Sequence, residues 1–295
     1  LHDAARGATA GRISSNRTNV EDATDSMASF NSDGFVVGSS AAYINSDSAN
    51  IVAWNWYGGG AGSSNTEGSI NTTKTSADTD AGFSIMTYTG NATSGATIGH
   101  GLTKAPEVVM TKKRGASGGW MVFHIGNTAA PETEELNLEV TEATQDSDNI
   151  WDDTAPTATV MSLGNNGGVN ANNVAFVLYC WHDVEGFSKF GGYTGNGVAD
   201  GPFIYTGFRP AFVLTKVTNA ADDWSIADNK RSPFNVAGES LRPNSTAVED
   251  SAADIDILSN GFKVRQADSH RINYGDDTFI YMAFAENPFK YANGR

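Results

Sequence analysis

The chain has 295 residues, of which 34 are acidic and 19 are basic, so its formal net charge is −15. This balance argues against a nucleic-acid-binding protein, which needs basic patches to neutralise phosphate. No apolar run approaches the roughly 18 residues of a membrane-spanning helix. The aromatic content of 10% argues against a disordered chain.

Turn-forming residues are abundant. Gly and Asn contribute 32 and 26 residues, while 39% of the chain is hydrophobic, and this mixture predicts a folded, β-rich protein. The single cysteine, Cys180, excludes an internal disulfide framework and a Cys-rich zinc site. It lies in the apolar run 174–181, so we expect a small buried core residue. The chain starts at Leu1 without a signal-peptide pattern, as expected of a processed or partial chain.

A spacing of about 104 residues recurs along the sequence. Self-similarity at a fixed period predicts a chain built from repeated structural units. The landmarks are Gly82-Phe83-Ser84 and Gly186-Phe187-Ser188, Tyr88-Thr89-Gly90-Asn91 and Tyr193-Thr194-Gly195-Asn196, Pro106 and Pro210, and Trp120 and Trp224.

Residues 1–57 are expected to be a partial β repeat whose front is missing. Three times an Asn precedes a closing aromatic residue by eleven positions, and Ile51–Trp54 is the expected closing strand of the first copy. We expect each closing aromatic in the core of a separate sandwich, and each Asn at a turn, with its side chain bonded to nearby backbone. The three pairs are Asn45/Trp56, Asn170/Trp181 and Asn273/Phe284.

Residues 58–80 are rich in Gly, Ser, Thr and Asn, which predicts a linker or long surface loop. Residues 81–185 and 186–289 are the two expected complete repeats, and 290–295 form a C-terminal tail. Short segments bounded by turn residues predict an all-β fold of tandem antiparallel β-sandwich-like repeats of about 104 residues. The expected strands are 83–88, 107–113, 119–124, 158–163 and 173–181, then 187–193, 211–217, 223–228, 254–259 and 277–285.

No set of catalytic or cofactor-binding residues is predicted, and a metal site is left open. The histidines lack ligand spacing, so His100 and His182 are interpreted as structural residues. Two acidic clusters offer hard oxygen ligands for calcium, without a complete binding-loop motif. These clusters are Asp78-Thr79-Asp80 and Asp146-Ser147-Asp148-Asn149. Three adjacent acid pairs are interpreted as solvated loop residues rather than glycosidase carboxylates: Asp152-Asp153, Asp222-Asp223 and Asp276-Asp277.

Several aromatic residues could form sugar-stacking platforms. Trp56, Trp120, Trp181 and Trp224 recur at fixed positions, so the repeats explain them better as core residues. Trp151 and Tyr57 have no counterpart and are the preferred candidates for a surface role. The full set of candidates is Trp54, Trp56, Tyr57, Trp120, Trp151, Tyr205 and Phe208.

Four segments carry a resemblance to a known family. They are Asp3–Thr9, the run Asp80–Asn91 with Ile98–Leu102 and Ala105–Val108, the stretch Cys180–Phe190, and the ending Tyr281–Phe289. The sequence resembles repeat domains of tail-fibre and other virion surface proteins of bacteriophages, especially marine short-tailed phages. The likeness covers nearly the whole chain apart from the linker, and its motifs are structural rather than catalytic.

The resemblance implies a non-enzymatic protein of the virion surface, most simply part of a phage tail fibre that mediates host attachment. Its partners would be a host cell-surface glycan or protein, other virion proteins and other copies of itself, with a trimer as the first expectation. Nucleic acid and membrane insertion are not expected. The alternatives are a capsid decoration or fibre protein with a structural role, and a tail depolymerase that degrades polysaccharide.

Overall fold

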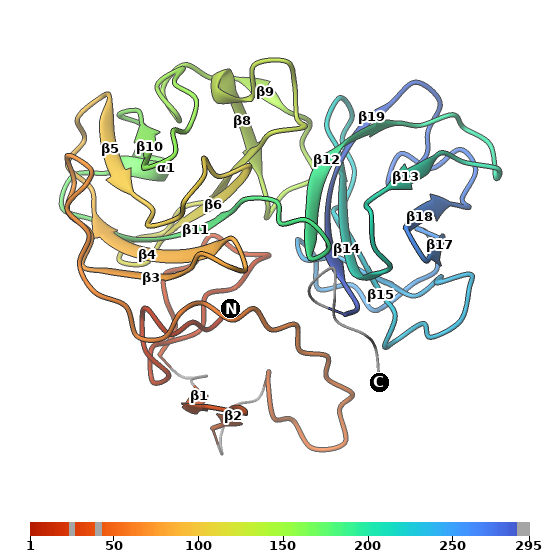
Figure 1. The fold of residues 1–295 in the computed structure, drawn as a ribbon, viewed down its shortest axis with the longest axis horizontal. Coiled ribbons are helices and arrows are strands. Elements are labelled where there is room, and N and C mark those ends of the chain that lie inside the picture. Colours follow the sequence, from red (N-terminus) through yellow and green to blue (C-terminus); the bar gives the residue numbers. More distant parts are fainter. Residues whose placement is uncertain (24–26, 39–42, 288–295) are drawn as a thin grey trace. The chain divides into compact units, whose positions relative to one another are not determined.

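The computed structural model describes residues 1–23, 27–38 and 43–287 (Figure 1). The chain folds into two compact units, and each unit is built from two separate stretches of the sequence. Unit 1 comprises Leu1–Met121 and Asp148–Trp181, and unit 2 comprises Val122–Ser147 and His182–Arg295. No helix in the described part of the chain has the length and apolar character needed to cross a membrane.

Unit 1 is built around strand β11 (Ala175–Trp181), which pairs antiparallel with β4 on one side and β6 on the other. β11 is buried from Phe176 to Trp181, as expected of a central strand that is apolar on both faces. The order of the main sheet within unit 1 is β3 (Lys74–Asp78), β4 (Phe83–Thr89), β11, β6 (Val108–Lys113) and β7 (Trp120–His124), which runs on into unit 2.

Three smaller elements complete unit 1. β5 (Ala96–Gly99) and β10 (Val160–Leu163) pair antiparallel in a second sheet. The one-turn helix α1 (Gly167–Asn170) starts at Asn166, whose side chain accepts a hydrogen bond from the backbone N–H of Gly168 at 2.7 Å. β1 (Met27–Asn31) and β2 (Gly34–Val37) form a separate hairpin.

Unit 2 is organised around β19 (Thr278–Ala285), which lies between β12 and β14. The order of its main sheet is β12 (Ser188–Thr194), β19, β14 (Pro210–Val217), β15 (Ser225–Asp228) and β16 (Ser240–Leu241). The order of a second sheet is β13 (Phe203–Tyr205), β18 (Gly261–Val264) and β17 (Ile255–Leu258). The 3-10 helix η1 (Pro131–Thr133) precedes the short pair β8 (Glu134–Asn137) and β9 (Gln145–Asp146).

The core of unit 2 fills the space between its two sheets. Val213, Tyr281 and Ala283 from the main sheet belong to the same buried cluster as Ile257 and Phe262 from the second sheet. This is the arrangement of a sandwich, in which the inner faces of two sheets share one core.

The prediction of an all-β fold is confirmed, because the described chain is nearly all strand and turn and its strand pairs are antiparallel. Each of the ten expected strands has an observed counterpart whose bounds differ by at most a few residues. The first, expected at 83–88, is β4, and the last, expected at 277–285, is β19. The short strands β1, β2, β3, β5, β8, β9, β13, β16 and β18 were not predicted.

Two expectations for the first 80 residues need correction. Ile51–Trp54 forms no strand, and Trp56 is half-buried in irregular backbone rather than in a sandwich core. The range 58–80, expected to be a linker, contains β3 and the buried Ile70, which forms a parallel bridge with Ile98. The expected tail at 290–295 lies outside the described residues.

Candidate functional site

The histidines and the cysteine singled out from the sequence are buried in the units. His100 is fully buried, its Nδ1 accepting from the backbone N–H of Leu102 at 3.1 Å and its Nε2 lying 3.1 Å from Thr157 O. His182 Nδ1 lies 2.8 Å from Asp183 O. Burial raises the pKa of the Cys180 thiol well above its usual value. The contacts of the two histidines are with backbone groups, and Cys180 lies in the apolar strand β11.

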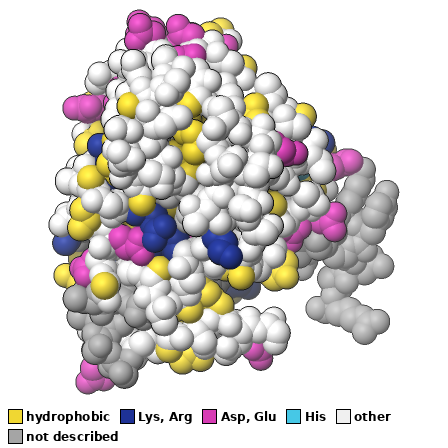
Figure 2. All heavy atoms as spheres, turned by 90° about the vertical axis from the view of Figure 1, so that its left-hand side faces the viewer, with side chains coloured by type: hydrophobic (Ala, Val, Ile, Leu, Met, Phe, Trp, Pro, Cys, Tyr) yellow, Lys and Arg dark blue, Asp and Glu magenta, His cyan; other side chains and the backbone are white. Residues whose placement is uncertain are grey.

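The candidate acids form no metal site in the described part of the chain. Within the described ranges, no group of three His, Cys, Asp or Glu side chains has the geometry to hold a metal ion. Asp78 Oδ1 accepts from the backbone N–H groups of Asp80 and Ala81, so this acid closes its own turn. Asp277 binds His270 Nδ1 at 2.7 Å. Figure 2 shows one face on which acidic and basic side chains are scattered among hydrophobic ones, and on which backbone and uncharged side chains cover most of the surface.

The aromatic candidates divide into buried and exposed sets. Trp151 is fully buried, so the prediction of a surface role for it is wrong. Tyr57 and Tyr205 are 75% and 65% exposed, whereas Phe208 lies in the core of unit 2. Trp120 and Trp224 are buried, as expected of core residues.

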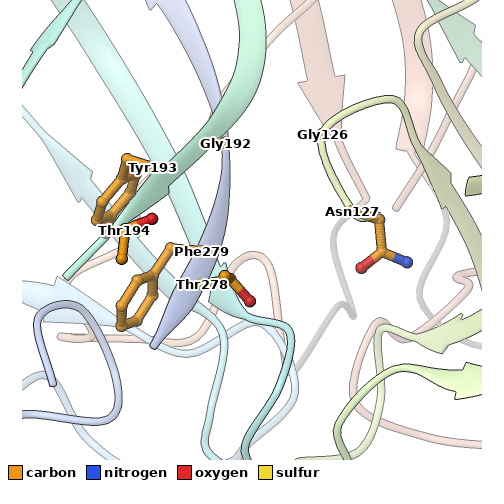
Figure 3. Close-up of a pocket in the computed structure, with 7 residues that line it drawn as sticks. All are labelled: Gly126, Asn127, Gly192, Tyr193, Thr194, Thr278 and Phe279. Atoms are coloured by element: carbon orange, nitrogen blue, oxygen red, sulfur yellow. The ribbon is translucent and has the colours of Figure 1, made fainter. Parts of the chain in front are cut away.

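Unit 2 contains a pocket of about 250 Å³ at the edge of β12 (Figure 3). The rings of Tyr193 and Phe279 stack on one side of it, 4.9 Å apart between centroids, and Asn127 lies on the other side. Burial raises the pKa of Tyr193 well above its usual value, and its hydroxyl donates to Ile272 O at 2.9 Å. The pocket could hold a small neutral polar group, but it supplies no acid or base that titrates near neutrality. Its lining is Gly126, Asn127, Gly192, Tyr193, Thr194, Thr278 and Phe279.

The shape of the pocket depends on a close approach of Gly126 to β12. A Cβ at position 126 would lie 2.5 Å from the carbonyl carbon of Gly191 and 2.7 Å from Gly192 N. We expect Gly126→Ala to displace the loop from β12 and lower the free energy of unfolding of unit 2 by about 1–3 kcal/mol, the usual cost of overpacking. Thermal unfolding measures the change. Gly115→Ala, where the nearest atom is 3.6 Å away, should leave the melting temperature nearly unchanged.

Two asparagines predicted to bond to backbone do so with matching partners. Asn170 accepts from Asn91 N at 2.8 Å and donates to Thr93 O and Gly164 O. Asn273 accepts from Asn196 N at 2.9 Å and donates to Val198 O and Gln266 O. Asn45 is exposed and donates to Gly38 O at 3.3 Å. Each of the two buried amides therefore fastens two loops to its unit.

Removing one of these amides should be costly. We expect Asn273→Ala to lower the free energy of unfolding by about 2–3 kcal/mol, because it leaves buried backbone groups of the loops without partners. Urea denaturation measures the loss. Asn45→Ala, which removes a single exposed hydrogen bond, is the matched control and should change stability by less than about 0.5 kcal/mol. Equal losses in the two variants would contradict this assignment.

A second polar arrangement is a fully buried lysine beside a tryptophan eight positions later. In unit 2, Lys216 Nζ donates to Thr141 O at 3.0 Å and Asp222 O at 2.8 Å, and Trp224 Nε1 donates to Asn137 O at 3.0 Å. Burial lowers the pKa of Lys216 to about 8, against the opposing effect of the nearby Asp222 and Asp223.

Unit 1 holds the same arrangement. Lys112 Nζ donates to Arg17 O at 2.7 Å and Gly118 O at 2.5 Å, and Trp120 Nε1 donates to Ser14 O at 2.9 Å. The acceptor carbonyls of Ser14, Arg17, Asn137 and Thr141 belong to segments that we call arms. An arm is an eleven-residue segment whose first and last residues pair as an antiparallel bridge: arm 1 is 12–22, arm 2 is 135–145 and arm 3 is 240–250.

The sequence did not predict the two buried lysines. Each lies in an apolar strand, where a charged residue is buried only when it has partners, and one partner of each lysine is distant in sequence. Arm 1 was missed because it lies 123 positions before arm 2, whereas arms 2 and 3 are 105 positions apart but share little sequence. The detectable signal was the sequence of arm 1, Asn-Arg-Thr-Asn-Val-Glu-Asp at 16–22, which returns in arm 3 as Asn-Ser-Thr-Ala-Val-Glu-Asp at 244–250.

Comparison with known proteins gives one match. The chain belongs to a family defined by a domain of unknown function, DUF7483, whose model matches residues 1–288. No curated protein and no solved structure matches the chain.

Proposed function

We propose that this member of the DUF7483 family is a non-enzymatic virion surface protein built from tandem repeats, part of a phage tail fibre that mediates host attachment. The proposal rests on the sequence resemblance and on one structural observation. The observation is that a buried lysine and tryptophan bind an arm in each unit, so that the same arrangement occurs twice in the chain.

Corresponding contacts support the repeat. Lys112 and Trp120 each lie 104 positions before Lys216 and Trp224, and both pairs donate to backbone carbonyls of an arm. β11 lies between β4 and β6 as β19 lies between β12 and β14. Tandem repeats are the kind of sequence from which extended arrays are built, as a fibre requires.

The composition supports a role outside the cell at a particle surface. The net charge of −15 limits non-specific adhesion to anionic envelopes and keeps copies soluble. The predicted partners are a host glycan or protein, other virion proteins and other copies of the chain.

Labelling the protein in particle images tests the location. Density for the label along a tail fibre supports the proposal, whereas density over the capsid lattice would favour the capsid decoration protein considered above. A label absent from purified particles would contradict both.

A turnover assay separates attachment from degradation. The purified chain is incubated with host surface polysaccharide, and reducing ends and unsaturated sugars are measured over time. We expect binding without sustained release. Continuous product formation would establish the depolymerase instead.

A further inference from the structure

We propose that arm 3 is a docking segment for unit 1 of a second copy of this chain, where it takes the position of that copy's arm 1. The inference deepens the proposed assembly role and rests on it. It names the surface and the partner through which copies join.

Arm 3 has the sequence that fits unit 1. Over the last seven positions, arms 1 and 3 share Asn, Thr, Val, Glu and Asp, whereas arm 2 shares only Thr141 with arm 1. The shared Glu has a defined partner. In arm 1, Glu21 Oε2 accepts from Arg114 Nε at 2.6 Å, and Glu21 N donates to Arg114 O at 3.2 Å.

The corresponding contact of arm 2 lacks this charge pair. There Thr144 N donates to Thr218 O at 2.8 Å, and threonines stand in place of both the glutamate and the arginine. Glu249 Oε2 pairs with Arg231 Nη1 of its own unit at 2.6 Å, much as Glu21 Oε1 lies 3.4 Å from Arg6 Nη1 in arm 1. Unit 2 has Thr218 in place of Arg114, so on unit 1 Glu249 would gain Arg114 as a second partner. Charge complementarity of this kind fixes partner and register.

Arm 3 also lacks the cover that the other arms have. The second residue of each arm is apolar, and Ile13 and Leu136 are both only 1% exposed. Leu241 in the same place is half-buried, and Val248 near the end of arm 3 is 84% exposed, against 47% for Val20 at the same place in arm 1. The carbonyl equivalent to Ser14 O and Asn137 O is Arg242 O, which accepts a 3.3 Å bond from Ser245 N of the arm itself.

Arm 3 is held ready for docking by its own unit. The Arg242 guanidinium pairs with Asp250 and lies 3.6 Å from Asp223, and Asn244 Oδ1 accepts from Trp224 N at 3.2 Å. A segment already fixed in its bound shape loses little entropy on binding. On unit 1 of a second copy, Arg242 O would face Trp120 Nε1, Ser245 O would face Lys112 Nζ, and Glu249 would pair with Arg114.

The contact is head-to-tail, because arm 3 of one copy meets unit 1 of the next. Such heterologous contacts close into rings or continue as filaments. Arm 1 of the same copy already occupies this position and, as an intramolecular ligand, competes strongly with arm 3 of a second copy. Association of the unaltered chain should therefore be weak and depend on concentration.

Weakening arm 1 alone should release this competition. Glu21→Arg places like charge against Arg114 and Arg6 and leaves arm 3 unchanged. Sedimentation velocity of the full chain should show association at least about tenfold tighter than that of the unaltered chain, the effect of losing roughly one charge pair. The double variant Glu21→Arg/Glu249→Arg should return to monomer. Glu142→Arg, at the exposed turn of arm 2, is the matched control and should behave as the unaltered chain.

A peptide provides a second measurement on the same protein. Peptide 240–250 should bind the Glu21→Arg chain and change its tryptophan fluorescence, whereas a peptide with the arm 2 sequence 135–145 should not. A folded Glu21→Arg chain that stays monomeric, or association that Glu249→Arg leaves unchanged, would overturn the proposal. If Glu21→Arg does not fold, concentration series of the unaltered chain and of Glu249→Arg decide, and equal association of the two would overturn it. Particle location plays no part in these outcomes, so this inference and the proposed function can fail separately.

Discussion

Replacing Trp224 by alanine is expected to lower the free energy of unfolding of unit 2 by about 3–5 kcal/mol. The side chain is 1% exposed, and its loss leaves a cavity between β15 and arm 2. Asn137 O also loses its indole donor, which adds to the cost when the carbonyl stays buried. Guanidinium unfolding followed by circular dichroism and fluorescence measures the change.

The control for Trp224→Ala is Tyr205→Ala, which removes an aromatic side chain that is 65% exposed. That variant should cost less than about 0.5 kcal/mol. Because two units need not unfold together, the Trp224 variant should separate an early transition of unit 2 from a later one of unit 1. Similar midpoints for both variants would show that contact with arm 2 contributes little to stability.

Acid should destabilise unit 2 through His124. Burial lowers the pKa of this histidine to about 4, against the opposing effect of its hydrogen bond to Tyr281 O. Its Nε2 lies 3.1 Å from Tyr281 O and its Nδ1 accepts from Gly126 N at 3.0 Å, so both ring nitrogens are satisfied in the neutral form. A second proton would face the Gly126 N–H.

The direction of the pH effect follows from the protonation of His124 in the folded and the unfolded chain. Above pH 6.5 His124 is neutral in both the folded and the unfolded chain. Between pH 6.5 and about 4 the unfolded chain binds a proton that the folded chain does not, so stability falls as the pH is lowered. The loss amounts to at most about 3 kcal/mol. Denaturant midpoints from pH 7 to pH 4 measure it.

The matched variant for the acid effect is His124→Gln, which removes the titrating group. Its stability should fall less steeply over this range than that of the unaltered chain. His2 also has its pKa lowered to about 4 by burial, so some dependence on pH remains. Parallel profiles for the variant and the unaltered chain would exclude His124 as the source.

The strands that could be predicted from sequence are those that carry their own signal. β11 and β19 are long apolar runs, and β6 and β14 each follow a proline-bounded turn. β3 could not be predicted this way, because its sequence Lys-Thr-Ser-Ala-Asp is mostly polar. These residues form a strand because they pair with the edge of β4. Tertiary pairing overrides weak local preference in such segments.

The failure at Ile51–Trp54 has the same physical origin. Its apolar pattern resembles that of β11, yet β11 is a strand because β4 and β6 lie on both sides of it. In the described residues no strand pairs with 51–57, so backbone hydrogen bonds do not fix it as a strand. The prediction for Trp151 failed because it rested on the lack of a counterpart at the 104-residue spacing, and such a lack does not indicate exposure.

The interleaving of the two units has a consequence for synthesis on the ribosome. β11 emerges only after Val122–Ser147, which belongs to unit 2, so unit 1 cannot complete its central strand until part of unit 2 has already been made. Arm 2 must then wait for Trp224, some 80 residues later, which takes about 4–16 s at typical elongation rates. During that interval Asn137 O of arm 2 lacks the indole N–H that it later accepts from. Slowing elongation between positions 148 and 224 should therefore increase misassembly of this chain, while the same slowing after position 285 should not.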